Sequence, residues 1–410
     1  MALVFFYPQF KKLTGAERLI LKLADYASRR LPPGEVILLT HRFAETCRPA
    51  LAPGVTLVET GWPMQPTGNH YLDATVEYAL GPALALHIPR GALRGVVFFG
   101  PPSVPAMWFA RRMLFPLRGI NTRLLYFCFE PPRFIYSDTA EVAARLGRFG
   151  PVMRVLAAAY RILDRRMVKS ASRVLSNSPY GARRIQKAYV RRATVIEHGV
   201  DFVRATNDEV AALRARYGLD GRRVVVTVNH LHPRKRVDLF LRAVEVVTRS
   251  VPGVTALVVG GGPEEVPLKV LANDLGMKEG RDVIFTGAVP EAELPAHYAM
   301  GDVYVHTGKE ESFGLSVIEA LAAGLPVVSV NEGGPCDTVQ DGISGYLVEP
   351  SPVALGSAIE KLLADPERSR KMGAAGANYV DTHFKWQRGA DTLLRLLDSS
   401  DAQVASRYSR

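Results

Sequence analysis

Two glutamates eight residues apart, Glu311 and Glu319, give the strongest chemical signal in this sequence of 410 residues. They flank the run Phe313-Gly314-Leu315, where we expect a helix to begin; it should continue through Ala323 and end at Gly324. A helix start offers unpaired backbone N–H groups and a partial positive charge, which suit a phosphate. An ionised carboxylate accepts hydrogen bonds and therefore suits hydroxyl groups. The pattern predicts a ligand that carries phosphates and many hydroxyls, such as a nucleotide sugar.

A second candidate lies after the expected strand Val224–Val228, in a run that reads Asn229-His230-Leu231-His232-Pro233-Arg234-Lys235-Arg236. Cationic side chains at the carboxyl end of a strand are well placed to neutralise a diphosphate. We predict this role for Lys235. A solvated basic turn is an equally good interpretation of Arg234 and Arg236.

Glycines and one histidine at other strand ends are weaker candidates. Thr14 and Gly15 stand between an N-terminal strand and a helix, where a glycine lets the backbone approach a ligand, although an ordinary turn glycine fits as well. The runs Gly260–Gly262 and Gly333–Gly334 predict either tight turns or ligand contacts. His306 ends a strand, and we expect it to be buried and hydrogen-bonded.

Apolar strand-like runs alternate with longer helical segments in both halves of the chain, which predicts parallel sheets flanked by helices. The strands are expected at 3–7, 35–40, 55–58, 96–99, 124–129, 173–177, 194–197, 224–228, 255–259, 283–285, 303–306, 327–330 and 346–348. The fold class is therefore α/β, with two Rossmann-like doubly wound domains facing across a cleft. We place the N-terminal domain at 1–200, the C-terminal domain at 201–379, a C-terminal helical segment at 380–398, and a frayed tail at 399–410.

Composition narrows the class of protein. The apolar content of 48% with 22% charged residues indicates a folded protein, and no apolar run is long enough to span a bilayer. Three isolated cysteines favour a reducing, cytoplasmic setting and argue against structural zinc. No P-loop and no HExxH zinc motif is found in the sequence.

The net charge of +11 is concentrated in one segment, residues 142–196, which holds thirteen Arg or Lys residues against a single acid, Asp164. Within it, residues 152–169 show helical periodicity: Leu156, Leu163 and Met167 share one face, and several arginines share another. We expect the apolar face to pack on the domain and the arginines to face outward. A plain solvated face, a dock for an anionic membrane or acceptor, and a nucleic-acid surface are the three interpretations. The last is disfavoured because no nucleic-acid motif accompanies the charge.

Taken together, these patterns resemble the retaining, nucleotide-sugar-dependent glycosyltransferases of family 4, which have the GT-B architecture, and the resemblance covers nearly the whole chain. The motifs that carry it are Gly15-Ala16-Glu17-Arg18, Asn177-Ser178, Gly199-Val200-Asp201, Lys235, Gly261-Gly262-Pro263, Glu311 through Glu319, and Gly333-Gly334. The spacing of the two glutamates around Phe-Gly-Leu is the most specific of them. The resemblance also implies that the C-terminal helix, within 380–398, packs back on the first domain.

The resemblance implies a role for each site residue. Glu311 and Lys235 are the implied catalytic residues: Glu311 would bind the hydroxyls of the donor sugar, and Lys235 would stabilise the departing diphosphate, so that no metal and no cofactor is expected. Glu319 would bind the ribose. Further donor contacts are implied for Gly15, Thr14, His230, Phe313, Gly314 and Leu315.

Two positions depart from the family pattern. His230 stands where relatives carry Arg, which replaces a fixed positive charge by a group that is only partly protonated near neutral pH. Phe129, in the run Phe129-Glu130-Pro131-Pro132-Arg133, stands where relatives carry a His that contacts the sugar. Phe129 and Glu130 are therefore predicted to line the acceptor or sugar pocket, and the two departures leave the choice of sugar open.

The run from Glu130 and the Gly333-Gly334-Pro335 turn are most similar to mannosyltransferases that extend lipid-linked oligosaccharides or polysaccharides. We therefore expect GDP-mannose as donor, a glycan or lipid-linked acceptor, and peripheral contact of residues 142–196 with an anionic membrane at its cytoplasmic face. No nucleic-acid partner is expected. Two alternatives remain: a UDP-sugar-dependent enzyme with a small soluble acceptor, and a nucleotide-sugar-binding protein that has lost catalysis.

Overall fold

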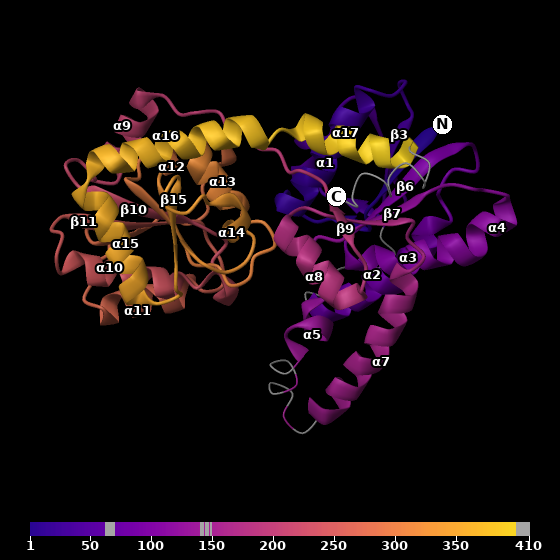
Figure 1. The fold of residues 1–410 in the computed structure, drawn as a ribbon, viewed down its shortest axis with the longest axis horizontal. Helices are drawn as coiled ribbons and strands as arrows, with labels where there is room; N and C mark the ends of the chain where they lie inside the picture. Colours follow the sequence, from indigo (N-terminus) through magenta and orange to yellow (C-terminus); the bar gives the residue numbers. More distant parts are fainter. Residues whose placement is uncertain (62–69, 140–142, 144–146, 148–149, 399–410) are drawn as a thin grey trace. The chain divides into compact units, whose positions relative to one another are not determined.

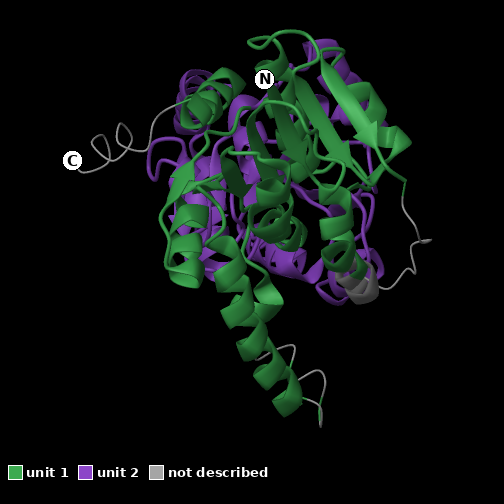
Figure 2. Cartoon of the chain, turned by 90° about the vertical axis from the view of Figure 1, so that its right-hand side faces the viewer, with its two compact units in different colours: residues 1–199, 386–410 green, residues 200–385 purple. Residues whose placement is uncertain are grey.

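The computed structural model of the chain describes residues 1–61, 70–139, 143, 147 and 150–398 (Figure 1). It divides into two compact units: unit 1 comprises Met1–Gly199 and the segment from Trp386, and unit 2 comprises Val200–Lys385 (Figure 2). The second boundary between the units was expected at 379/380. The observed boundary comes later because helix α16, Pro366–His383, continues past that point within unit 2. The predicted tail, 399–410, lies outside the described residues.

Unit 1 contains a parallel sheet of seven strands in the order β5-β3-β1-β6-β7-β8-β9. These strands are β1 Ala2–Phe6, β3 Val36–Thr40, β5 Val55–Glu59, β6 Leu93–Phe99, β7 Leu124–Phe127, β8 Arg173–Ser176 and β9 Ala193–Val195. A small pair, β2 Gln9–Phe10 and β4 Arg42–Phe43, lies outside this sheet. The strand order reverses between β1 and β6, and such switch points are where doubly wound sheets bind ligands.

Unit 2 repeats this plan with six parallel strands in the order β12-β11-β10-β13-β14-β15. They are β10 Arg223–Val228, β11 Val254–Val259, β12 Val283–Phe285, β13 Val303–His306, β14 Val327–Val330 and β15 Gly345–Val348. Its switch point lies between β10 and β13. The predicted α/β class with two doubly wound sheets is confirmed, and each expected strand forms within a few residues of its expected ends.

Helices cover both sheets. Unit 1 has α1 Gly15–Ser28, α2 His70–Ala85, α3 Val104–Phe109, α4 Phe115–Arg118, α5 Arg133–Tyr136, α7 Gly150–Val168, α8 Pro179–Tyr189 and α17 Trp386–Asp398. Unit 2 has α9 Asn207–Arg216, α10 Val237–Thr248, α11 Glu265–Asp274, α12 Leu294–Ala299, α13 Leu315–Ala322, α14 Pro335–Thr338, α15 Pro352–Ala364 and α16. No helix in the described part of the chain combines the length and the apolar character that crossing a bilayer requires.

The last helix returns to the first unit, as predicted. Helix α17 packs against α1, and its apolar face, which includes Leu393 and Leu397, joins the core around Phe5 and Phe99. Gly389 allows the close approach, because a Cβ at this position would overlap the carbonyl oxygen of Glu197.

Much of the orientation expected for helix α7 is wrong, although Met167 is buried and Arg154 is exposed, as expected. Leu156 and Leu163 do share a face, but these side chains are 57% and 50% exposed. The opposite face points into unit 1, where Arg161 donates to the carbonyl of Ile135 over 2.5 Å and Arg165 donates to the carbonyl of Ala188 over 2.7 Å. The periodicity identified the two faces of the helix but not which of them packs on unit 1. The arginines pack there because backbone carbonyls accept their hydrogen bonds, whereas the leucines have no core to pack against.

Candidate active site

Three ionisable side chains meet at the carboxyl end of β13. Lys235 Nζ lies 2.5 Å from Glu311 Oε1, and His306 Nε2 lies 3.7 Å from the same oxygen. Gly308 makes room for this group, since a Cβ there would overlap Glu311 Oε1. Lys235 follows β10 and Glu311 follows β13, so the pair lies at the switch point of the unit 2 sheet. The structure thus brings together the two residues predicted to be catalytic.

The protonation states of this cluster follow from its burial. Burial disfavours the imidazolium of His306 and lowers its pKa to about 4. Burial also acts to raise the pKa of Glu311, but the neighbouring basic side chains, Lys235 among them, outweigh it and lower the pKa below its ordinary value. At neutral pH the cluster therefore presents an ionised carboxylate beside a neutral imidazole.

His306 differs from the expected hydrogen-bonded core histidine. Its side chain is fully buried, as expected, but neither ring nitrogen has a hydrogen-bond partner. Buried polar groups are normally paired, and a group left unpaired in a native structure requires a reason. Its position against Glu311 adds His306 to the candidate site.

The start of helix α13 lies beside this cluster. Gly314 precedes the first turn with φ of +82°, a left-handed conformation that glycine adopts without strain. Phe313 is almost fully buried, and Leu315 is the first helical residue. The backbone N–H groups predicted to contact sugar and phosphate are thus held at a helix start, where such groups bind anions.

The Gly333-Gly334 turn supports that helix start. A Cβ on Gly333 would lie 2.7 Å from the carbonyl oxygen of Glu311, and one on Gly334 would lie 2.6 Å from the Cα of Phe313. Gly334 N–H also donates to the carbonyl of Glu311 over 2.6 Å. These glycines are therefore required by close backbone packing under the site.

Glu319 is oriented by a residue that sequence reasoning missed. Tyr298, on α12, donates its hydroxyl to Glu319 Oε2 over 2.7 Å. Tyr298 is fully buried, so this bond fixes one oxygen of the carboxylate from the protein side. The two residues are 21 positions apart and on different helices, and no local pattern in the sequence pairs them.

His230 lies at the end of β10 on the exposed side of the turn. Its Nδ1 lies 2.9 Å from the carbonyl oxygen of Gly261. A Cβ on Gly260 or Gly262 would overlap the backbone of Asn229 or Leu231, so the glycine run packs against this turn. The ring of His230 is thereby tied to the strand end that precedes Lys235.

Arg236 forms hydrogen bonds that hold the loops around the site together. It adopts a left-handed backbone conformation with φ of +47°. Its Nε donates to the carbonyl of Thr307 and its guanidinium pairs with Glu332, both over 2.7 Å. These bonds tie the turn after β10 to β13 and to the loop that follows β14, and so help to position Lys235.

In unit 1, Thr14 is the N-cap of helix α1 and Gly15 is its first residue. The Thr14 N–H donates to Glu17 Oε2 over 3.1 Å, and Tyr7 donates its hydroxyl to Glu17 Oε1 over 3.2 Å. Burial and the carboxylate of Glu17 raise the pKa of Tyr7, which stays protonated as the donor. Gly15 itself is exposed.

Phe129 and Glu130 follow β7 in the same unit. The ring of Phe129 lies 5.1 Å from that of Phe127 and extends a row of aromatic rings from the core. Glu130 accepts a hydrogen bond from Arg133 over 2.9 Å and another from Arg184. Glu130 is therefore held by two guanidinium groups.

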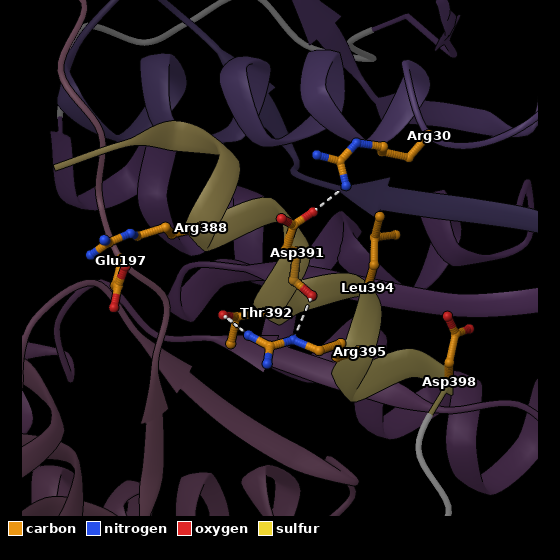
Figure 3. Close-up of a pocket in the computed structure, with 8 residues that line it drawn as sticks. All are labelled: Arg30, Glu197, Arg388, Asp391, Thr392, Leu394, Arg395 and Asp398. Carbon is orange, nitrogen blue, oxygen red and sulfur yellow. Dashed lines mark hydrogen bonds and ion pairs between the residues drawn. The ribbon is translucent and has the colours of Figure 1, made fainter. Parts of the chain in front are cut away.

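A pocket of about 630 Å³ on unit 1 holds none of the predicted residues (Figure 3). Most of its lining is charged and paired: Arg30 with Asp391 at 2.5 Å, and Asp398 with Arg94 at 2.8 Å. Exposed pairs of this kind are worth at most about 1 kcal/mol each. We assign this hollow to the solvated surface of α17.

Comparison with known proteins identifies the region that holds this cluster. Residues 210–379 match the family described as glycosyl transferases group 1. The chain carries a glycosyltransferase group 1 domain. The domain spans most of unit 2 and includes Lys235, His306, Glu311 and Glu319.

Two curated mycobacterial proteins are similar to the chain. Both are named GDP-mannose-dependent alpha-(1-6)-phosphatidylinositol monomannoside mannosyltransferase. The one from Mycolicibacterium smegmatis is 39% identical over 57% of this chain and 64% of its own length. The one from Mycobacterium tuberculosis is 36% identical over 55% of this chain and 61% of its own length. The match therefore spans less than two thirds of either relative.

Solved structures show how far the fold extends beyond the group 1 domain. The structure of HepE from Anabaena in complex with UDP and glucose has a TM-score of 0.69 and 19% identity, covering 98% of this chain and 100% of that one. Sucrose-phosphate synthase from Thermosynechococcus elongatus gives a TM-score of 0.72 at 19% identity, covering 99% of both chains. The chain thus has the GT-B fold over nearly its whole length, as the sequence predicted.

Proposed function

We propose that the chain is a retaining glycosyltransferase that moves mannose from GDP-mannose to a glycan or lipid-linked acceptor, in polysaccharide or glycolipid synthesis. The observation that carries this proposal is the pair of Lys235 and Glu311 beside the start of α13, within a glycosyltransferase group 1 domain. The names of the mycobacterial relatives support GDP-mannose as donor.

Lys235 and Glu311 can act together on such a donor. The Lys235 ammonium has three N–H donors, so it can stay paired with Glu311 while it donates to the diphosphate. Its charge stabilises the negative charge that develops on the leaving diphosphate, and the proposal needs no metal for this step. Glu311, ionised and acceptor-only, binds hydroxyls of the sugar.

The other predicted contacts complete the donor site. Glu319, oriented by Tyr298, binds the ribose hydroxyls, and the N–H groups of Phe313 to Leu315 bind sugar or phosphate. His230 contributes near the diphosphate. Thr14 and Gly15 supply the donor contacts of unit 1.

The proposed stereochemistry is retention at the anomeric carbon. Glu311 does not act as a nucleophile in this proposal, since it binds sugar hydroxyls and pairs with Lys235. We propose that the acceptor hydroxyl attacks the face from which the diphosphate departs, and that the diphosphate takes the hydroxyl proton. The anomeric configuration is then retained.

The acceptor is assigned to unit 1. Phe129 and Glu130 of this unit would line the acceptor or sugar pocket, and the basic segment 142–196 would contact an anionic membrane at the cytoplasmic face. A lipid-linked acceptor agrees with the relatives, whose names specify a phosphatidylinositol mannoside. Anionic lipids attract basic residues close to the surface by about 1 kcal/mol each.

Transfer assays test the proposal. Purified protein is incubated with radiolabelled GDP-mannose and membrane lipid extract, and the labelled glycolipid is quantified and its linkage determined by NMR. We expect an α-linked mannosyl product and its loss in Glu311→Gln. Absence of transfer and of donor hydrolysis under all acceptor conditions would instead indicate a nucleotide-sugar-binding protein without catalysis.

A second candidate is a UDP-sugar-dependent transferase with a small soluble acceptor. His230 stands at the predicted diphosphate contact in place of a guanidinium, and this departure leaves the choice of donor open. A further relative, from Segniliparus rotundus, is named D-inositol 3-phosphate glycosyltransferase. Competition between GDP-mannose and UDP-sugars in the transfer assay distinguishes the two candidates.

A further inference from the structure

Helix α7 has an exposed apolar face and a polar face that packs on unit 1. Its outward face carries Val152, Val155, Leu156, Ile162 and Leu163, each between 50% and 69% exposed. Ala159 continues the same face and is also exposed. In Figure 1 the first turns of α7 extend away from the sheet of unit 1. Scattered exposed apolar side chains are ordinary, but a continuous row along one helix marks an interaction surface.

The inward face of α7 is polar and well bonded. Asp164 is fully buried and accepts a hydrogen bond from Tyr136 over 3.0 Å. Arg161 and Arg165 donate to backbone carbonyls of α5 and α8, which pack against α7 together with α3. This face holds the helix on unit 1, so the apolar row is not needed for packing.

Several other basic residues of segment 142–196 also point inward. Arg191 donates to the carbonyls of Val168 and Ala171 over 3.0 and 2.9 Å, and Arg184 donates to the hydroxyl of Ser137 over 2.6 Å. The outward charge is therefore smaller than the sequence suggests. Arg166 and Lys169 remain exposed at the carboxyl end of the apolar row.

We infer that α7 is an interfacial helix, which inserts its apolar row among the acyl chains of an anionic lipid surface while Arg166 and Lys169 contact the headgroups. A 19-residue helix is about 28 Å long, and such helices lie in the membrane plane with the apolar face buried below the headgroups. The inference deepens the proposed function and rests on its membrane-side acceptor, but replaces purely electrostatic contact by insertion.

The charge around the apolar row of α7 indicates which partner binds it. Several basic residues of segment 142–196 stay exposed, among them Arg154, Arg166, Lys169 and Arg183, and its one acid, Asp164, is buried. A second copy of this surface would bring the same positive charge against itself, whereas an anionic leaflet would be attracted. A nucleic acid is disfavoured because its phosphates bind cationic side chains, whereas this face of the helix is apolar.

Vesicle sedimentation with neutral substitutions tests the insertion. The double variant Leu156→Gln with Leu163→Gln leaves the charge unchanged and removes two exposed side chains from the row. We expect its partitioning to phosphatidylcholine–phosphatidylglycerol vesicles to fall by on the order of a hundredfold, since burial of each such side chain is worth about tenfold. The matched control is Val266→Gln with Val270→Gln on α11, which removes two exposed apolar side chains from unit 2 and should leave partitioning unchanged.

Salt separates insertion from surface charge. Arg166→Gln should weaken partitioning by about fivefold at low salt and by less at high salt, because exposed charges are screened. The wild type should retain binding at high salt that the Leu156 and Leu163 variant has lost. An environment-sensitive dye on Ala159→Cys should shift to shorter wavelength with vesicles, and the same dye on Val266→Cys should not.

Two results would overturn the inference. One is unchanged vesicle partitioning of the Leu156 and Leu163 variant, provided that near-UV circular dichroism shows an intact fold. The other is a lipid-free dimer in analytical ultracentrifugation that this variant abolishes, which would assign the row to a second copy. Binding of GDP-mannose in lipid-free solution tests the donor site separately, so failure of the proposed function and failure of the insertion are distinguishable.

Discussion

Units 1 and 2 share a parallel-sheet architecture but display different chemistry. Unit 2 presents charged groups at its switch point, and each has a specific polar partner: Lys235 with Glu311, and Glu319 with Tyr298. Unit 1 presents the aromatic ring of Phe129 after β7 and the apolar row of α7. The difference agrees with the proposed function, in which unit 2 binds the charged donor and unit 1 binds the lipid-linked acceptor.

The largest expected effect concerns Glu311. Glu311→Gln keeps the shape of the side chain but removes the charge that pairs with Lys235. We expect transfer to fall by about a hundred- to a thousandfold, the range for loss of one group that stabilises the transition state. Steady-state kinetics measure this, with Glu279→Gln, at an exposed pair with Lys269, as control. A fall of less than threefold, within the scatter of such controls, would contradict the role of unit 2.

Each unit also contains a buried histidine whose charge is disfavoured. Burial lowers the pKa of His306, in unit 2, and of His198, in unit 1, to about 4. Because an unfolded histidine titrates near 6.5, unfolding takes up protons below that pH, so this contribution to stability is full above about pH 6.5 and is lost as the pH falls toward 4. The expected loss is about 3 kcal/mol for each histidine.

Urea unfolding at a series of pH values measures this loss. His306→Asn should flatten the pH dependence of unfolding by about one proton. The same slope in the variant and the wild type would show that His306 does not remain neutral in the folded chain.

A smaller effect is expected at Lys235. Lys235→Met removes a charged donor to the diphosphate, which is worth about 1.5–3 kcal/mol, and GDP should bind about ten- to a hundredfold more weakly. Isothermal titration calorimetry measures this, and Lys269→Met, which removes an exposed lysine on α11, serves as the control. Equal affinity for GDP in the two variants would show that the diphosphate does not bind at the end of β10.

The smallest effect tests how Glu319 is oriented. Tyr298→Phe removes one hydrogen bond to its carboxylate at nearly constant volume, and about 1 kcal/mol of ribose affinity should be lost with it. GDP should then bind about fivefold more weakly, while mannose 1-phosphate, which has no ribose, should bind unchanged. Tyr217→Phe, whose hydroxyl contacts His297, is the control.

The sheets could be predicted because buried parallel strands have continuous apolar runs in their sequence. Strand Val283–Phe285 forms as expected, and so does Val327–Val330. The local motif after β13 was also readable, since Gly314 and the two glutamates lie within one loop and one helix. The return of α17 was predicted from the resemblance to the GT-B glycosyltransferases.

What could not be read depends on contacts between distant residues. The pairing of Tyr298 with Glu319 joins two helices, and the missing partners of His306 result from burial that no periodicity reveals. The orientation of α7 failed for the same reason. Its amphipathic pattern is symmetric with respect to inside and outside, and the acceptors for Arg161 and Arg165 lie in α5 and α8.

The central claim is that unit 2 binds a guanine nucleotide sugar through Lys235, Glu311 and Glu319. A thermal-shift panel of GDP, UDP, ADP and their sugars tests it most directly, because a ligand at a hundred times its Kd stabilises the folded state by about 2.7 kcal/mol. We predict the largest rise in Tm with GDP-mannose, a smaller one with GDP, and none with GDP-mannose in the Glu311→Gln and Lys235→Met double variant. Equal or no shifts across the panel, or an unchanged shift in the double variant, would contradict the account.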